Sequence, residues 1–492
     1  MKILMVYPEF PDTFWSFKHA LKFIRKKATS PPLGLLTVGA LLPEDWEKRL
    51  IDLNIRSLST RDLAWADYVF ISGMTVQSDS AKRIISRCNR KGVPVIAGGP
   101  LFTMDYQDFP GVKHYILNEA EITLPLFLYD LKKGQARRLY STDQYPDIRK
   151  TPAPLWSMLN MHEYEVMPLQ FSRGCPFNCD FCNVTALLGH RPRIKNTEQV
   201  LVELDGLYHQ GWKNSVFFVD DNFIGNKKYL KEELLPALIR WRKGKTGFTF
   251  STEASINLAD DPKLIELLVA AGFNKVFIGI ETPEESALEE CGKSQNMKRD
   301  LVQDVKTLQR SGIEVQAGFI VGFDSDNQTI FQRQIDFIQK SGIVTAMVGL
   351  LQAPLGTKLY SRLKKEQRIQ GKMSGDNVDG STNIVPVMGL EKLREGYQYL
   401  MKNIYAPKQY YQRVKTFLEE YQPVKFKIRL SGQHILAFFR SIYLLGIVNR
   451  ERRHFWDLLF WTLKEKPAQF SKAITMAIYG YHFNKICELY IN

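Results

Sequence analysis

The sequence contains one short loop with three cysteines, Cys175, Cys179 and Cys182, in the run FSRGCPFNCDFCNV. Three thiolates spaced this closely can each bind one iron of a [4Fe–4S] cube, and the lack of a fourth nearby cysteine leaves one iron open to an external ligand. An open iron indicates chemistry, because clusters that only transfer electrons usually have four cysteine ligands. The loop is therefore the main candidate for a reaction centre.

Other uses of the cysteines fit their spacing less well. A structural zinc site needs two spaced pairs of ligands, and the nearby His190 follows Cys182 without a second pair. Disulfides are not expected, because six cysteines in 492 residues, with Cys88, Cys291 and Cys487 isolated, are typical of a reduced, cytosolic protein. A chance three-cysteine cluster in a zinc or redox site is the remaining alternative.

The cysteine loop resembles that of radical S-adenosylmethionine (radical SAM) enzymes. In that family the open iron binds the amino and carboxylate groups of SAM, and the reduced cluster cleaves SAM to a 5′-deoxyadenosyl radical. The resemblance assigns Cys175, Cys179 and Cys182 to the cluster and the backbone of Phe181 to the adenine. It also implies an external electron donor of the flavodoxin or ferredoxin type.

The middle of the chain, residues 166–362, repeats a buried strand and a helix six times. This pattern resembles the partial (β/α)6 barrel of radical SAM proteins, in which the chemistry lies at the carboxyl ends of the strands. The expected strands are 167–172, 215–220, 247–253, 275–281, 314–322 and 346–352. Polar residues follow several of them, namely Asp220, Asp221, Glu253, Glu281 and Gln352.

These polar residues suit SAM, whose ammonium group and ribose diol need acceptors in a mostly dry pocket. By resemblance, VDDNF (219–223) receives the methionine amino group, and GFIVG, with Gly318 and Gly322, flanks the adenine. Glu253 and Glu281 are expected to contact the ribose or the amino group. Their alternative role is to cap the helices that follow them.

The front of the chain, residues 1–140, alternates continuous apolar runs with helical stretches, as in a doubly wound parallel sheet. Such a sheet binds ligands at the carboxyl ends of its strands. The expected strands are 2–7, 49–54, 68–74, 94–100 and 114–118, and the candidate contacts in the loops after them are Ser72, Gly73, Met74, Thr75, Gly98, Gly99 and Glu119.

A cobalamin is the ligand that the resemblance implies for this domain. No G-x-G-x-x-G follows the first strand, so a dinucleotide is not expected. A sheet of this kind before a radical SAM core, with PPLGLLTVGALL at 31–42, resembles the front domain of cobalamin-dependent radical SAM enzymes. The chain lacks D-x-H-x-x-G, so we expect no histidine to bind cobalt from below. The alternative is a degenerate domain retained for packing.

The remaining segments connect and extend these two units. Residues 141–165 are rich in Pro and polar residues and predict an interdomain strap. Residues 363–492 predict a helical C-terminal extension, in which 364–383 is the expected mobile loop. The fold class is therefore α/β, with a doubly wound sheet, a partial barrel and a helical extension.

The formal charge of +14 is concentrated near the end of the chain. Residues 425–492 contain 11 Lys and Arg and 4 Asp and Glu, interleaved with Phe, Tyr and Trp. This composition favours a peripheral contact with an anionic membrane, with a solvated basic cap and a nucleic-acid patch as alternatives. The start, MKILMVYPEF, predicts a buried strand and not a signal peptide. We expect a cytoplasmic protein, peripheral at the inner membrane face.

The combined pattern predicts a cobalamin-dependent radical SAM enzyme that methylates an unactivated carbon. PPLGLL, VDDNFIGN, GIETPE and LLQAP resemble most closely the strings of hopanoid C-2 methylase-type proteins, which implies a hydrophobic, polycyclic isoprenoid substrate. A radical cyclase or rearrangement enzyme with the same cofactors, and a non-catalytic cobalamin sensor, are alternatives. A methylthiolating RNA modifier is not expected, because such proteins have further cysteines in the front domain, where Cys88 stands alone.

Overall fold

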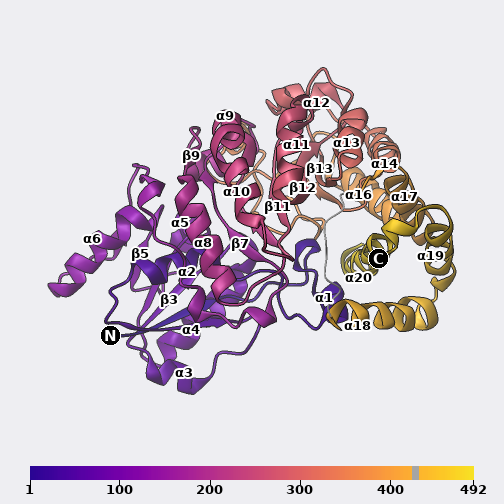
Figure 1. The fold of residues 1–492 in the computed structure, drawn as a ribbon. Coiled ribbons are helices and arrows are strands. Elements are labelled where there is room, and N and C mark those ends of the chain that lie inside the picture. The colour runs from indigo at the N-terminus through magenta and orange to yellow at the C-terminus, as the bar shows by residue number, and fades with distance from the viewer. Residues whose placement is uncertain (424–431, 492) are drawn as a thin grey trace.

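The computed structural model describes residues 1–423 and 432–491, so the first residues of the predicted basic tail, 425–431, lie outside the described residues. The front of the chain forms a parallel sheet with the order β2-β1-β3-β4-β5-β6 (Figure 1). The five predicted strands are present, and β6 was not predicted. The strands are β1 (Lys2–Tyr7), β2 (Glu47–Asp52), β3 (Tyr68–Ser72), β4 (Val95–Gly98), β5 (His114–Ile116) and β6 (Leu139–Tyr140).

Helices cover both faces of this sheet, which confirms the doubly wound fold. Along β1, Leu4 and Val6 point into one hydrophobic core, and Ile3 and Met5 point into another. The first core is closed by α3 (Thr60–Trp65), α4 (Ser78–Arg90) and α5 (Pro100–Asp105). The second core is closed by α2 (Leu33–Leu41) and α6 (Ala120–Lys132).

The second sheet is the predicted open barrel, with six parallel strands in the order β14-β13-β12-β11-β10-β7. The strands are β7 (Met167–Leu169), β10 (Val216–Phe218), β11 (Phe250–Glu253), β12 (Phe273–Glu281), β13 (Glu314–Val321) and β14 (Ala346–Leu350). The helices that follow include α8 (Thr197–His209), α10 (Leu235–Arg242), α11 (Pro262–Ala271), α13 (Leu301–Arg310) and α14 (Ile330–Ser341). A short antiparallel pair that was not predicted, β8 (Ser172–Arg173) and β9 (Arg193–Ile194), interrupts the first repeat.

The C-terminal extension is helical and packs on the barrel (Figure 1). Helices α16 and α17 lie against α14, and the long α20 contacts α16, α17 and α1 of the front segment. The elements are α1 (Lys18–Ile24), α15 (Lys358–Lys365), α16 (Leu390–Tyr405), α17 (Pro407–Glu420), α18 (Gly432–Ser441), a π-helical segment (Ile442–Val448), α19 (Arg452–Glu465) and α20 (Phe470–Tyr490). Among the described helices, none is long and apolar enough to span a bilayer.

The predicted mobile loop at 364–383 is instead packed against the barrel. Val378 and Asn383 are buried, and the Asn383 side chain bonds the backbone of Ala353 in both directions. Lys372 forms ion pairs with Asp105 and Asp108 of the front domain. The segment shows no helical or strand periodicity because its polar groups bond partly to the barrel and partly to one another in turns, as Ser381 does with Asp379 and Ser374. Its sequence therefore looks like that of a free loop.

Candidate functional site

The cysteine loop is closed at its neck by the β8–β9 pair. Arg173 lies opposite Arg193 in this pair, and residues 174–192 form the loop between them. Gly174 has a φ of +93°, and a Cβ at this position would lie 2.8 Å from the Gly189 carbonyl oxygen. The neck therefore requires glycine, both for its backbone conformation and for its close approach.

The three predicted cluster ligands lie close enough to interact electrostatically. Burial raises the pKa of Cys182 to about 12, and the charge of Cys179 adds to this increase. Burial and the same neighbour also raise the pKa of Cys175. In the described part of the chain, no three His, Cys, Asp or Glu side chains surround a single metal ion. Three neighbouring thiols on one loop fit a cube that takes one thiolate on each of three irons.

Asp220 anchors the approach to the loop. Its carboxylate is fully buried and accepts hydrogen bonds from the backbone N–H groups of Phe171 and Ser172, the former at 3.1 Å. Because Ser172 begins β8, this carboxylate fixes the strand that leads to Cys175. If Asp220 also accepts a hydrogen bond from SAM, as predicted, its carboxylate does so in addition to these two structural hydrogen bonds.

Asp221 and Glu253 form an anionic group beside the cysteines. Burial raises the pKa of Asp221 to about 6 and that of Glu253 to about 8, and the charges of Asp221 and Asp220 contribute to the latter. Asp221 also raises the pKa of Cys175 and Cys182, which places it near the cluster ligands. Carboxyl groups held this close together are stabilised by a cation between them. The arrangement therefore fits the ammonium group of SAM.

Glu281 forms a buried ion pair with Lys293, whose Nζ lies 2.7 Å from Oε1. Glu281 has a φ of +62°, and a Cβ on neighbouring Gly279 would lie 2.8 Å from Lys293 Nζ. Lys293 lies 5.9 Å from the centre of the Phe181 ring, and the charges of Glu281, Cys179 and Cys182 raise its pKa against the effect of burial. A permanent cation therefore faces the thiols. No motif in the sequence marked Lys293, since only the fold brings it to the loop.

The remaining predicted barrel residues have structural partners. A Cβ on Gly318 would lie 3.0 Å from Phe277 Cζ, and Gly322 has a φ of +106° and donates its N–H to Asp326 at 2.8 Å. Gln352 donates to the carbonyl oxygens of residues 376 and 381, so it holds the packed segment described above. The Phe181 ring packs edge-on against Phe323. Gly322 and Gln352 follow β13 and β14, Gly318 lies within β13, and Phe181 lies in the cysteine loop. The contact of each with SAM stays a prediction.

The predicted front-domain loops meet at one edge of their sheet. A Cβ on Gly98 would lie 2.5 Å from the Ile116 carbonyl oxygen, and a Cβ on Gly99, whose φ is +84°, would overlap Ser72 Oγ. Gly73 accepts a hydrogen bond from the Leu101 N–H. These close approaches are sufficient to explain why glycine occupies these positions. The contact of these loops with cobalamin therefore also stays a prediction.

Met74 and Thr75 lie at the boundary with the barrel. Met74 is half-exposed, and Thr75 contacts the packed C-terminal segment at Gly375, where a Cβ would lie 2.9 Å from Thr75 Cβ. No histidine occurs in the loops that lead from β1 to α1, from β3 to α4, from β4 to α5 and from β5 to α6, and His19 lies in α1. The buried His114 lies at the start of β5, with Nδ1 2.6 Å from the Arg137 carbonyl oxygen.

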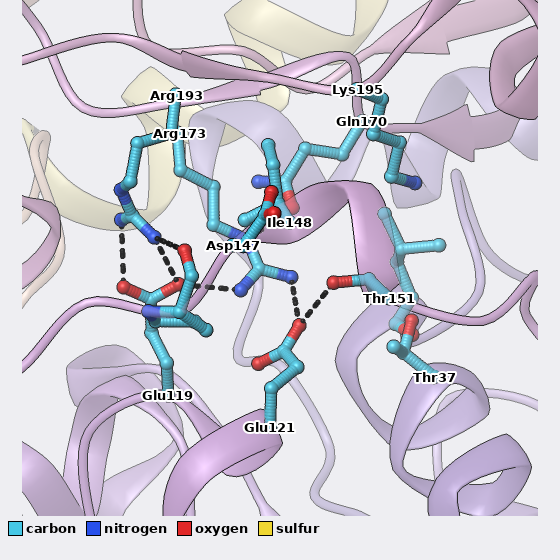
Figure 2. Close-up of polar contacts among 12 residues, drawn as sticks. Thr37, Glu119, Glu121, Asp147, Ile148, Thr151, Gln170, Arg173, Arg193 and Lys195 are labelled. Atoms are coloured by element: carbon cyan, nitrogen blue, oxygen red, sulfur yellow. Dashed lines mark hydrogen bonds and ion pairs between the residues drawn. The ribbon is translucent and has the colours of Figure 1, made fainter.

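Glu119 belongs to a buried ion-pair network that joins the front domain to the cysteine loop (Figure 2). Arg193 binds both Glu119 oxygens, at 2.7 and 3.0 Å, and Arg173 binds Glu119 at 2.6 Å and Glu121 at 2.8 Å. Thr151 of the strap donates to Glu121 at 2.8 Å. The four charged side chains are only 7–19% exposed. The Glu119 carboxylate was predicted to contact cobalamin, but in the structure it is bonded to the loop neck.

Cys291 was interpreted as isolated, yet it lies beside the cysteine loop. Its carbonyl oxygen accepts the Asp180 N–H at 2.9 Å, and its buried thiol donates to the Leu288 carbonyl oxygen at 3.6 Å. Burial raises the pKa of this thiol to about 12. This contact could not be predicted from the sequence, because more than a hundred residues separate Cys291 from the loop.

Family models match three parts of the chain. Residues 25–128 match a B12 binding domain, residues 169–338 match the Radical SAM superfamily, and residues 357–492 match a domain of unknown function (DUF4070). The chain is 39% identical to an uncharacterized methyltransferase (sll1242) of Synechocystis sp., over 99% of this chain and 92% of that protein. It is 36% identical to a hopanoid C-2 methylase of Rhodopseudomonas palustris, over 75% of this chain and 71% of that protein.

The fold is also similar to that of a solved structure. The structure of OxsB, a cobalamin-dependent S-adenosylmethionine radical enzyme with aqua-cobalamin and S-adenosylmethionine bound, matches 100% of this chain and 84% of its own with a TM-score of 0.62. The two sequences are 14% identical, so this likeness concerns the fold. Its coverage includes the front sheet, the barrel and the helical extension.

Proposed function

This chain belongs to the family of cobalamin-dependent radical SAM methyltransferases, and we propose that it methylates an unactivated carbon of a hydrophobic, polycyclic isoprenoid. The protein is an enzyme, and its cofactors are a [4Fe–4S] cluster, SAM and cobalamin. Together these groups supply the methyl group, its carrier and the means to form a radical on an unreactive carbon. The finer assignments of residues and substrate are the subject of the proposal.

In this proposal the barrel residues have distinct tasks. Cys175, Cys179 and Cys182 bind the cluster, and Asp221 and Glu253 accept the ammonium group of SAM. Their raised pKa values support this assignment, because two neighbouring, poorly solvated carboxyls favour a cation. Asp220 positions β8 through its two backbone hydrogen bonds, and Lys293 balances the thiolate charge from its ion pair with Glu281.

The similarity to the hopanoid C-2 methylase carries the substrate proposal. The inner side of the barrel supports it, because Phe277 of β12 and Met347 of β14 are only partly buried there. Trp15 from the front segment contacts both, with its ring 5.4 Å from that of Phe277 and its Nε1 donating to Met347 Sδ at 2.9 Å. An apolar, partly open surface of this kind suits a hydrocarbon skeleton.

Methyl transfer from labelled SAM tests this function. Anaerobically reconstituted protein, loaded with cobalamin and given a reductant, is incubated with SAM that carries a deuterated methyl group and with a pentacyclic triterpenoid in detergent. We expect the labelled methyl group in the lipid, measured by mass spectrometry. A product isomer without label would favour a cyclase or rearrangement enzyme, and no turnover of SAM would favour a cobalamin sensor.

Two partners complete the proposal. We propose an external electron donor of the flavodoxin or ferredoxin type, because the reduced cluster must be regenerated. We also propose a peripheral contact with the inner face of the membrane, from which an isoprenoid would be taken. The basic, aromatic composition of residues 432–491 supports this contact, and no feature of the sequence favours nucleic acid over it.

A further inference from the structure

The helix formed by α18 and the π-helical segment exposes large apolar side chains along one face. Ile435, Phe439, Tyr443, Ile447 and Val448, here called the apolar stripe, are between 52% and 63% exposed. Ile435, Phe439, Tyr443 and Ile447 follow one another at intervals of four residues and Val448 directly follows Ile447, so they share one side of the helix. A contiguous exposed apolar surface in a folded protein marks an interaction site.

The opposite face of the same helix is buried. Ala437, Ser441, Leu445 and Gly446 face the protein core. Residues 442–448 adopt the wider π-helical turn, which keeps the later members of the stripe in line with the earlier ones. The helix is therefore apolar on both sides, because Phe438, Ile442 and Leu444 pack against the core while the stripe faces outward.

Exposed apolar side chains also lie on α19, which packs beside the π-helical segment. Trp456 donates its Nε1–H to the Gly446 carbonyl oxygen at 2.9 Å, and its ring stacks on that of Phe460 at 5.7 Å. Phe460 and Leu463 are 63% and 52% exposed. The apolar surface thus reaches across two helices at the lower right of the molecule in Figure 1.

Basic side chains border this surface. Arg440 donates to the carbonyl oxygens of Lys22 and Phe23, which seats α18 against α1. Three further cations, Arg450, Arg452 and Arg453, lie exposed just after the apolar stripe. Within the described part of the chain, none of these three arginines forms an ion pair with a carboxylate. Their charge is therefore available to an anionic partner.

We propose that the apolar stripe and its bordering arginines dock the enzyme onto an anionic lipid bilayer. The apolar side chains would enter the boundary between headgroups and acyl chains, and the arginines would face lipid phosphates. A second copy of this chain is disfavoured as the occupant, because a symmetric pairing would bring two arginine clusters together. The proposal assigns a role to the second half of the domain of unknown function.

The docked surface is connected to the barrel through the front segment. Helix α1, on which α18 rests, follows Trp15 and Phe17. The Phe17 ring lies 5.1 Å from those of both Tyr479 and His482 on α20, and Trp15 contacts Phe277 inside the barrel. Passage of a lipid along this aromatic segment rests on the isoprenoid substrate of the proposed function, whereas docking deepens the membrane contact proposed there and does not depend on the substrate.

Flotation of the full-length, cofactor-loaded protein with lipid vesicles tests the proposal. The vesicles contain phosphatidylcholine with phosphatidylglycerol, or phosphatidylcholine alone. The stripe variant combines Ile435→Ser, Phe439→Ser and Tyr443→Ser, and the charge variant combines Arg450→Gln, Arg452→Gln and Arg453→Gln. We expect the wild type to float with the anionic vesicles. The fraction of the stripe variant that binds these vesicles should fall by about tenfold or more. Each large apolar side chain contributes strongly to the free energy of transfer into the bilayer.

A matched control carries Leu126→Ser and Tyr129→Ser on α6, where both side chains are also exposed. This control should float like the wild type, and the charge variant should lose its preference for anionic vesicles. Iron and cobalamin contents equal to those of the wild type confirm folding of each variant. Flotation of the stripe variant at the wild-type level, no flotation of the wild type, or a stripe-dependent dimer in size-exclusion chromatography would overturn the proposal. Methyl transfer in detergent is independent of these outcomes.

Discussion

At the scale of single residues, the thiols of the cysteine loop are expected to be indispensable for iron. Replacing Cys175, Cys179 and Cys182 together by Ala should abolish iron and sulfide binding after anaerobic reconstitution, because the irons lose all their protein ligands. Iron analysis and the visible absorbance of the cluster measure this. Cys291→Ser is the sharpest control, since its thiol lies next to the loop but is bonded to the Leu288 carbonyl oxygen. Full iron content in the triple variant would contradict the assignment.

The carboxyl groups of Asp221 and Glu253 beside the loop make SAM binding dependent on pH. The pKa of Glu253 is raised to about 8, so its carboxyl group is mostly protonated at about pH 7. The ammonium group of SAM should lower this pKa, and binding should therefore release a proton. The release should vanish at higher pH, where the group is already ionised.

Calorimetric titration with SAM in two buffers of different ionisation enthalpy measures this proton release. The Glu253→Gln variant should show no difference between the buffers and should bind SAM more weakly. Equal heats in both buffers for the wild type at about pH 7 would show that Glu253 does not lose a proton, and would remove it from the SAM site.

At the scale of elements, the β8–β9 pair fixes the cysteine loop to the front domain through the buried network of Glu119, Glu121, Arg173 and Arg193. Arg193→Gln leaves Glu119 with one fewer guanidinium in a buried site, and we expect a loss of about 3–5 kcal/mol in stability. Arg193→Lys keeps the charge but loses the two-point contact, so a smaller loss is expected. Denaturant unfolding measures both.

A matched control and a second measurement distinguish the effect of this buried network from that of an exposed ion pair. Arg149 pairs with Asp147 at 2.8 Å in an exposed position of the strap, so Arg149→Gln should have no measurable effect. In Arg193→Gln the cluster loop should also become accessible, seen as faster loss of iron to a chelator. Unchanged stability and iron loss in this variant would show that the network does not hold the loop.

At the scale of the whole molecule, the C-terminal extension is part of the barrel core. Helix α20 stacks Phe483 on Phe14 at 4.3 Å, and Tyr410 donates its hydroxyl to the Met476 carbonyl oxygen. A chain that ends after residue 423 should therefore be insoluble or unfold at a much lower temperature. The loss of several fully buried side chains, at about 2–5 kcal/mol each, exceeds the usual stability of a domain. Soluble, cooperatively folding truncated protein would contradict this expectation.

The same packing determines how the front sheet can be studied. Phe14 and Phe23 belong to the core of the barrel and its extension, although they precede β2 in the chain. Cobalamin binding should therefore be measured on the full-length protein and not on residues 1–140. We expect a base-off absorption spectrum there, unchanged by His19→Ala, because the sequence lacks D-x-H-x-x-G and the loops directly after the front strands contain no histidine. A base-on spectrum would show a lower ligand from another part of the chain.

The sequence alone determined the features that depend on residues close to one another in the chain. Apolar runs of the right length predicted the main strands of both sheets, because a buried parallel strand must be apolar on both faces. The spacing of Cys175, Cys179 and Cys182 indicated the cluster, and polar residues after the strands indicated the site edge. The family comparisons confirmed the radical SAM and cobalamin identities.

The tertiary structure alone decided which distant groups meet. Lys293 faces the thiols, Glu119 bonds Arg173 and Arg193, and residues 364–383 pack against the barrel although their sequence resembles a free loop. The physical reason is that a buried charge or backbone group needs a partner, but the partner can come from any part of the chain. Periodicity reports burial along one segment, and it contains no information on which segment satisfies the polar groups of another.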